Sequence, residues 1–451
     1  IHYEFEVGPL VRHCIKQGED VNLLIGWSGP SADALQEEYS SLGASVFRVP
    51  AHLASGDPHV SHKRRTTAAT DKRHIVRRGL SNIRKLIYFL KLIINIRSFS
   101  KKHLEKVKPQ AIIIGADFIC GNLHSALLAR CVKDNIPVFG IPYTPYVAVR
   151  DAVIARFMTL NEGIVNPIIL VSDSLFNKIL GGLFPQWVLS HDNCQVFPFD
   201  PILILAAWIC GLIERTPWRR VSWRLTRFFI GSSHAYKMLE LDGQPMENIQ
   251  ISGLPRLDSV IELANKPGAR YLILCDLQID PDSKFILWNI LPTWEHGECS
   301  YEDHWSDVMR IKDILECLNL PVVISLHPIC NIETYKTLEN NTFCISRKYS
   351  IYQLAPFAAF VAAYLCSTNL MITELNVSVI ALDAKKEAAL DGPLRYEHRI
   401  EGVEIVHTLD DLAVALQRAA ALASKKKIDD ADLKNYKPAC PAILNEICDF
   451  V

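Results

Sequence analysis

Residues 322–328, with the sequence Val-Val-Ile-Ser-Leu-His-Pro, decide the fold of this chain. Four of the first five residues are apolar and three of these are β-branched, and the stretch follows a Leu-Asn-Leu-Pro sequence that is typical of a helix end. The pattern predicts a buried parallel strand that ends at His327 and Pro328. In an open α/β sheet, ligands bind beyond the carboxyl ends of the strands. A strand that only happens to end in His-Pro fits these residues equally well, so the surrounding sequence has to decide between the two interpretations.

Short apolar runs alternate with amphipathic segments on both sides of this stretch. The other predicted strands span residues 21–25, 45–49, 111–114, 138–141, 228–230, 249–252, 285–290, 342–345, 360–363, 377–382 and 403–407. Such alternation indicates parallel sheets with right-handed crossovers, and we therefore expect an α/β fold. Residues 143–227 break the alternation with prolines, tryptophans and short apolar runs, and we expect them to be irregular or helical.

The length of 451 residues exceeds what one compact core accommodates, so two domains are expected. The Asp-Pro-Asp sequence at 280–282 is the predicted linker. We expect a first domain at 1–281, a second at 282–425, and a helical tail at 426–451 that packs back on the first domain. The sequence opens in a predicted helix without the strand that should precede it, so we expect a truncated amino end.

Composition indicates a soluble globular protein, with 49% hydrophobic and 22% charged residues. The thirteen cysteines include no Cys-x-x-Cys pair, which favours reduced thiols of a cytoplasmic protein over disulfides or zinc ligands. No signal-peptide pattern opens the sequence, and the longest uncharged apolar run, 201–213, is too short to cross a bilayer.

Positive charge gathers in residues 62–108, which hold fifteen lysines and arginines against only Asp71 and Glu105. Part of this segment, 81–107, is predicted to be a long helix with one apolar and one cationic face. Two interpretations stay open: a crossover helix with a solvated face, and attachment to an anionic membrane surface. Nucleic acid is not an expected partner, because the stretch has few aromatic residues for base stacking.

Hydroxyl side chains follow a later predicted strand. Ser367 and Thr368 stand where the strand 360–363 gives way to a helix, and hydroxyls and backbone N–H groups at such a point suit the oxygens of a phosphate. His327 adds a further donor at the same predicted edge. Ordinary helix capping explains the Ser-Thr pair alone equally well.

These motifs together resemble glycosyltransferases of the two-Rossmann GT-B fold, and the likeness covers most of the chain. Residues 231–258 resemble the end of the family's first domain, with Gly-Leu-Pro-Arg-Leu-Asp at 253–258. Residues 290–327 resemble bacterial surface-polysaccharide enzymes such as CDP-glycerol glycerophosphotransferases and the sialyl- and Kdo-transferases. Residues 401–416 resemble the closing strand and helix.

The resemblance implies two Rossmann-like domains that face a cleft, with the donor nucleotide on the second. His327, Pro328, Ser367 and Thr368 would hold its phosphate, and Thr293 would line the donor site. From their positions alone, we expect Glu295 to bind sugar hydroxyls, and Arg256 and the basic segment to meet an anionic acceptor or lipid-linked glycan. Glu374 would bind the ribose, although it comes later than the family's glutamate and the following Asn-Val-Ser-Val-Ile lacks the usual glycine and proline.

An inverting transferase needs a base in its first domain. Asp117, at the end of a predicted strand, is the first candidate, followed by Glu4 and Glu6. No Asp-x-Asp motif stands in a suitable place, so we expect neither a metal nor any other cofactor.

The predicted function is transfer of a sugar from a nucleotide donor to a surface glycan or lipid-linked glycan, by a cytoplasmic enzyme at the inner face of a membrane. A CMP-linked acidic sugar is slightly preferred to a UDP-linked one. An epimerase of the UDP-N-acetylglucosamine 2-epimerase type and a non-catalytic binding subunit are the alternatives.

Overall fold

The computed structural model describes residues 2–25, 30–50, 53, 72–115, 122–142, 169–191, 194–197, 200–213, 222, 224–241, 243–295, 299–383, 402–425 and 436–451. The chain forms two compact units. Unit 1 comprises Ile1–Tyr143, Asn166–Pro255 and Cys440–Val451, and unit 2 comprises Thr144–Val165 and Arg256–Ala439. None of the helices in the described ranges is long and apolar enough to cross a membrane.

The division between the units falls at Pro255 and not at the predicted linker. Helices α10 (Pro255–Ala264) and α11 (Ala269–Asp276) lie before that linker, yet residues from Arg256 onward belong to unit 2. Arg270 of α11 explains this placement, because its guanidinium donates to the carbonyls of Ser283 and Phe357, each at 2.7 Å. The apolar run at 271–275 lies within α11.

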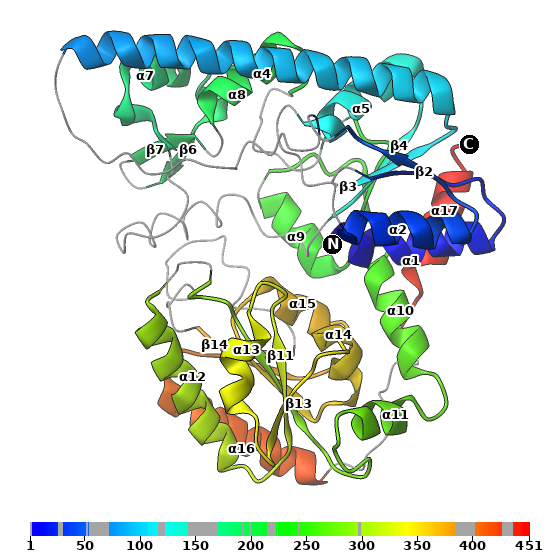
Figure 1. Ribbon diagram of the computed structural model, residues 1–451, viewed down its shortest axis with the longest axis vertical. Helices are drawn as coiled ribbons and strands as arrows, with labels where there is room; N and C mark the ends of the chain where they lie inside the picture. Colours follow the sequence, from blue (N-terminus) through cyan, green and yellow to red (C-terminus); the bar gives the residue numbers. More distant parts are fainter. Residues whose placement is uncertain are drawn as a thin grey trace. The chain divides into compact units, whose positions relative to one another are not determined.

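Unit 1 is built on a parallel sheet of four strands in the order β3-β4-β8-β9. Strands β3 and β4 are labelled in Figure 1. The four strands are β3 (Ile112–Gly115), β4 (Val138–Ile141), β8 (Arg227–Ile230) and β9 (Ile249–Ile251). A parallel pair, β1 (Asn22–Ile25) and β2 (Ser45–Arg48), and an antiparallel sheet of β5 (Ile169–Leu170), β7 (Cys194–Phe197) and β6 (Leu189–His191) accompany it. The predicted strands of the first half are thus present, and the antiparallel sheet lies in the segment that had been expected to be irregular or helical.

The helices of unit 1 are α1 (His2–Lys16), α2 (Pro30–Ser41), α4 (Lys72–Val107), α5 (Leu123–Asp134), α7 (Leu175–Leu183), α8 (Pro201–Ile209), α9 (Ser233–Leu241) and α17 (Ala439–Cys448), which begins at the last residue of unit 2. Helix α17 is joined to the sheet by Glu446, whose carboxylate accepts from Arg227 Nε at 3.0 Å. The ring of Phe450, just beyond it, lies against the ring of Phe139 on β4. The C-terminal segment therefore completes the core of unit 1.

Unit 2 contains a parallel sheet of six strands in the order β12-β11-β10-β13-β14-β15. The strands are β10 (Ile286–Ile290), β11 (Val322–Leu326), β12 (Phe343–Ile345), β13 (Phe360–Tyr364), β14 (Val379–Leu382) and β15 (Val403–Val406). Besides α10 and α11, its helices in the described ranges are α12 (Tyr301–Glu316), α13 (Ile332–Tyr335), α14 (Ile351–Leu354), α15 (Ser367–Thr373) and α16 (Leu409–Lys425). Four of the five residues of β11 are buried, which confirms the buried parallel strand predicted from the opening stretch.

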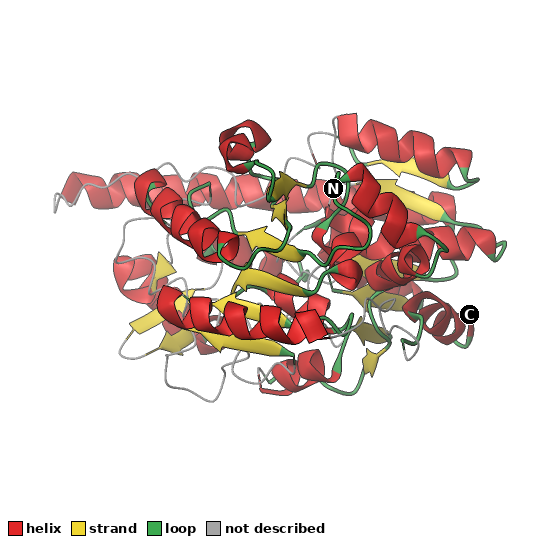
Figure 2. Cartoon of the chain, turned by 90° about the horizontal axis from the view of Figure 1, so that it is seen from below, coloured by secondary structure: helices red, strands yellow, loops and turns green. Residues whose placement is uncertain are grey.

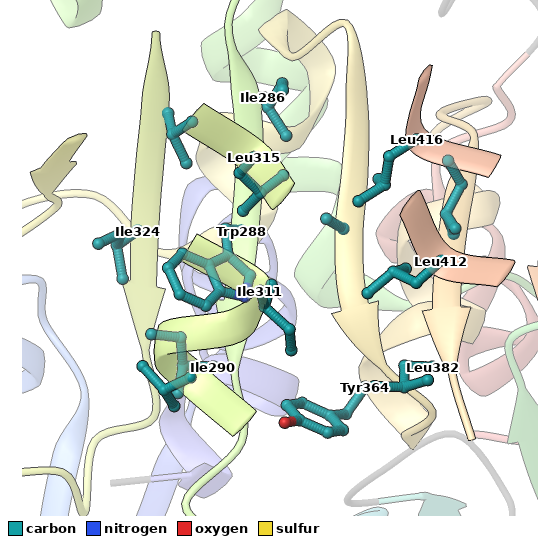
Figure 3. Packing of buried hydrophobic residues seen from close by; sticks show 14 of the residues in the cluster. Ile286, Trp288, Ile290, Ile311, Leu315, Ile324, Tyr364, Leu382, Leu412 and Leu416 are labelled. Atoms are coloured by element: carbon teal, nitrogen blue, oxygen red, sulfur yellow. The ribbon is translucent and has the colours of Figure 1, made fainter. Parts of the chain in front are cut away.

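One face of this sheet carries the main core of unit 2 (Figure 3). Trp288 of β10, Ile324 of β11 and their neighbours pack against Ile311 and Leu315 of α12 and against Leu412 and Leu416 of α16. Short helices α14 and α15 approach the sheet as well, and helices flank the strands in Figure 2. Burial on both faces is why the central strands β10, β11, β13 and β14 read as nearly continuous apolar runs, whereas the edge strand β15 includes exposed Glu404.

Candidate functional site

The strand order of unit 2 reverses between β10 and β13. From β10 the chain adds β11 and β12 on one side, and then returns to add β13, β14 and β15 on the other. In doubly wound sheets of this order, ligands bind beyond the carboxyl ends of the strands at the reversal. The loops that follow β10, β11 and β13 therefore mark the candidate ligand site.

Thr293 lies in the loop after β10 and bonds to a histidine that the sequence analysis did not single out. Its Oγ1 lies 2.8 Å from His304 Nδ1, and Cys299 Sγ donates to the same hydroxyl at 3.3 Å. His304 belongs to the first turn of α12 and is only 3% exposed. The loop is thus fastened to the helix that follows it.

The hydrogen bonds continue from His304 to Tyr335 and Glu295. His304 Nε2 lies 2.8 Å from the Tyr335 hydroxyl, which donates to Glu295 Oε1 at 2.8 Å. Because that hydroxyl donates to the carboxylate, it accepts from His304 Nε2–H, and Nδ1 accepts from Thr293. With a neutral His304, each side chain donates a hydrogen bond to the next, from Cys299 to Glu295. We call this chain of hydrogen bonds the β10 network; it comprises Cys299, Thr293, His304, Tyr335 and Glu295.

Burial fixes the protonation states within the β10 network. It lowers the pKa of His304 below its ordinary 6.5, which keeps the imidazole neutral. Burial and the hydrogen bond to Glu295 raise the pKa of Tyr335, so its hydroxyl stays a donor. Burial and the same carboxylate raise the pKa of Cys330, in the loop after β11, to about 12. Glu295 therefore sits among neutral groups and links the loops after β10 and β11.

Aromatic rings pack around the β10 network. The rings of Trp294 and Tyr301 meet edge to face with centroids 4.9 Å apart, and the ring of Trp305 lies 5.2 Å from that of Tyr335. Trp294 is 36% exposed, so it presents an apolar surface at the end of β10. Such packing fixes the loop through shape as well as through hydrogen bonds.

His327 follows β11 directly and forms a tight turn with the residues after it. Its carbonyl accepts from Cys330 N at 2.9 Å, and its Nδ1 accepts from Ile329 N at 3.2 Å. A ring nitrogen that accepts is unprotonated, so the proton of the neutral ring is on Nε2. His327 is half-buried and Pro328 is exposed, which gives the turn an Nε2–H donor at the carboxyl edge of the sheet.

Thr368 and Arg256 are connected through Tyr352. The Tyr352 hydroxyl donates to Thr368 Oγ1 at 3.4 Å, and the Arg256 guanidinium lies over the Tyr352 ring, 4.9 Å from its centroid. Arg256 Nη1 also lies 3.5 Å from Met371 Sδ of α15. The Arg256 guanidinium and the Thr368 hydroxyl thus lie near the first turn of α15, beside the end of β13. Both groups can donate hydrogen bonds to an anion.

Two further acidic residues lie near the sheet. Glu374, predicted to bind ribose, is exposed and caps the carboxyl end of α15, so it lies at the opposite end of that helix from Ser367. Asp383 directly follows β14; its side chain is 2% exposed and lies 3.4 Å from His407 Nδ1. Neither Asp383 nor His407 was among the site residues predicted from the sequence.

Three predicted residues cannot be placed as side chains. Asp117 lies outside the described residues. Glu6 lies on α1 and Ser367 is the first residue of α15, but their side chains are not among those described. Within the described parts, no group of three His, Cys, Asp or Glu side chains is arranged to hold a metal ion.

The Gly-Leu-Pro-Arg-Leu-Asp motif at 253–258 has a structural explanation. Gly253 has φ +84°, a conformation that strains other residues, and Pro255 then opens α10. Asp258 accepts from Ala439 N at 2.8 Å and from the Tyr436 hydroxyl at 2.7 Å. The motif therefore turns the chain into α10 and secures the residues that lead into α17.

Comparison with known proteins identifies the fold. No protein-family model matches the chain, and no curated protein matches it by sequence. The structure is similar to UDP-GlcNAc 2-epimerase from Neisseria meningitidis bound to UDP-GlcNAc, at 11% identity and a TM-score of 0.51, over 100% of this chain and 98% of that one. It is also similar to a putative UDP-N-acetylglucosamine 2-epimerase from Listeria monocytogenes, at 10% identity and a TM-score of 0.52, over 100% and 94%.

The two epimerase structures, with TM-scores above 0.5, show that the fold is GT-B-like. Calicheamicin glycosyltransferase CalG4 matches at 10% identity and a TM-score of 0.49, over 99% of this chain and 94% of that one. The GT-B resemblance noted in the sequence is confirmed for the fold, whereas the resemblance to polysaccharide transferases stays a prediction.

Most of the β10 network was missed at the level of sequence, although one signal was present. His304, Val308, Ile311 and Leu315 recur at helical spacing and are all buried, so the periodicity places His304 on the inner face of α12. A histidine on such a face needs a polar partner. Nothing local identifies Tyr335 as that partner, since it lies 31 residues away.

Proposed function

We propose that this protein binds a nucleotide sugar at the carboxyl edge of unit 2, between β10 and β13. The observation that carries the proposal is the convergence of donors on the reversal point: His327 after β11, and Thr368 with Arg256 beside β13. Phosphate oxygens require such donors. The UDP-GlcNAc bound by the Neisseria meningitidis protein of the same fold supports the choice of ligand class.

We further propose that the reaction is transfer of the sugar to a surface glycan or lipid-linked glycan. The resemblance of the donor-side motifs to surface-polysaccharide transferases supports transfer, and it favours a CMP-linked donor slightly over a UDP-linked one. Asp117 is the proposed base. Thr293, Pro328 and Ser367 are the proposed neighbours of the nucleotide, Glu295 of the sugar, and Glu374 of the ribose.

A sugar-nucleotide 2-epimerase is the second candidate, because the two similar structures with the higher TM-scores bear that name. An epimerase interconverts its sugar nucleotide without an acceptor, whereas a transferase requires one. Incubation with UDP-GlcNAc alone, followed by chromatography of the sugars, separates the two reactions. A non-catalytic subunit would bind nucleotide and leave the sugar unchanged whether or not an acceptor is present.

Calorimetric titration with CMP, CDP and UDP tests nucleotide binding itself. We expect His327→Ala to weaken the preferred nucleotide by about 1–3 kcal/mol, which is the contribution of a hydrogen bond to a charged group. His13→Ala, on α1 in unit 1, is the matched control and should leave affinity unchanged. An absence of binding for all three nucleotides would contradict the proposal, and an unaltered affinity in His327→Ala would remove that residue from the site.

A further inference from the structure

Helix α4 carries two apolar faces, and only one of them is covered by the described protein. The covered face includes Phe89, Ile93 and Ile96, which are 6%, 0% and 3% exposed. It packs against α5 and α8, which lie along the helix in Figure 1. This inner face explains why α4 is part of the core of unit 1.

The other face exposes a line of isoleucines. Ile83, Ile87 and Ile94 are 55%, 47% and 56% exposed, and neighbouring Tyr88 is 59% exposed. Spacings of four and seven residues bring the three isoleucines to one side of a helix. A face that only meets water has no physical reason to align three such side chains, since each exposes apolar surface at a cost.

Positive charge surrounds this line. Helix α4 contains eleven lysines and arginines and one acidic residue, Glu105. Two of these residues contact other parts of unit 1. Lys85 forms an ion pair with Asp200, and Arg97 donates to the carbonyl of Cys210. Arg84, Lys91 and Lys102 are exposed and form no ion pair with any residue that the structure describes. Lys91 stands between Ile87 and Ile94, so cations and isoleucines share one face.

We propose that this face of α4 docks on an anionic lipid surface. Isoleucines would enter the boundary between headgroups and acyl chains, while the flexible stems of Arg84, Lys91 and Lys102 let their charges meet lipid phosphates. A second copy of the chain fits less well, because pairing two such helices would bring strong like charges together. Docking on a membrane would bring the enzyme to a lipid-linked acceptor, and in that respect the proposal rests on the proposed function. The structural evidence for docking comes from α4 alone.

Vesicle cosedimentation of the full chain tests the proposal. The vesicles contain phosphatidylcholine alone or with about one third phosphatidylglycerol. We expect binding only to the anionic vesicles, and weaker binding as salt rises. Changing Arg84, Lys91 and Lys102 together to Gln should weaken binding about a hundredfold, because each basic residue contributes about fivefold at an anionic surface. Changing Ile83, Ile87 and Ile94 together to Ser should also weaken binding about a hundredfold.

The matched control changes Lys133, Lys266 and Arg310 to Gln, which removes three exposed basic residues outside α4. It should bind as the unchanged protein does, and circular dichroism should show all variants folded. Three results would overturn the proposal. The protein could fail to bind anionic vesicles, or the control could lose as much vesicle binding as the α4 variants. Sedimentation could also show a dimer that becomes a monomer in the isoleucine variant. UDP titration of the same samples keeps the two proposals distinguishable, because vesicle binding without nucleotide binding contradicts only the proposed function.

Discussion

The Tyr335 hydroxyl is the centre of the β10 network, and Tyr335→Phe removes that hydroxyl alone. Tyr335 is fully buried, and its oxygen joins His304 Nε2 to Glu295 Oε1 at 2.8 Å on each side. The ring contact with Trp305 survives the substitution, because the phenyl ring keeps its shape. The variant therefore isolates the hydrogen bonds from the packing.

The expected loss of stability comes from the two hydrogen bonds that the Tyr335 hydroxyl makes. A hydrogen bond to a charged carboxylate contributes about 1.5–3 kcal/mol, and a buried N–H that loses its acceptor costs about 1 kcal/mol more. We expect Tyr335→Phe to lower the stability of unit 2 by about 2.5–4 kcal/mol. Since the network also links the loops after β10 and β11, we expect weaker nucleotide binding as well.

Native-state hydrogen exchange measures this cost in unit 2 specifically. A chain with two units need not unfold in a single transition, so one denaturation midpoint would mix them. Amides of the buried strands β10 and β11 exchange only when unit 2 opens, and their exchange rates give its free energy. Tyr301→Phe is the control, because Tyr301 is 43% exposed on neighbouring α12. If both variants lower the stability equally, the hydrogen bonds assigned to Tyr335 do not stabilise unit 2.

Two further predictions concern pH and the motif at 253–258. Burial lowers the pKa of His304, so the unfolded chain takes up a proton more readily than the folded one; the stability of unit 2 should be complete above pH 6.5 and decline as pH falls through the lowered pKa. Exchange of the β10 and β11 amides between pH 8 and pH 5, corrected for the intrinsic pH dependence of amide exchange, measures the stability of unit 2, and a flat profile would contradict this prediction. Asp258→Ala should free the amide of Ala439 to exchange and cost about 1–3 kcal/mol. Exposed Asp282→Ala is its control, and an unchanged exchange rate at Ala439 would refute the role of Asp258.

The parallel strands of both units were predictable because short apolar runs alternate with amphipathic segments, whereas the antiparallel strands β5, β6 and β7 were not predicted. The stretch 322–326 is the clearest case, and β13 and β15 fall within one residue of their predicted bounds. Helix α2 begins at Pro30, since proline suits a first helical position. The 271–275 run was harder to assign, because α11 buries Ala269, Ile273 and Leu274 while it exposes Tyr271 and Leu272.

The candidate site was predictable only in part. His327 and Thr368 follow strands, so their positions on one edge come from the alternation of strands and helices. The partnership of Glu295 with Tyr335 joins residues 40 apart and depends on how α13 returns to the loop after β10. Position along the chain could suggest that Glu295 faces a ligand, but only the three-dimensional structure shows its bond to a buried hydroxyl.

A crystal structure with UDP or CMP bound tests the central claim most directly. We predict that the nucleotide phosphates lie beyond the carboxyl ends of β10 and β13, with His327 Nε2 and the Thr368 hydroxyl within hydrogen-bonding distance of their oxygens. Nucleotide bound at any other position, such as the sheet of unit 1, would contradict the account.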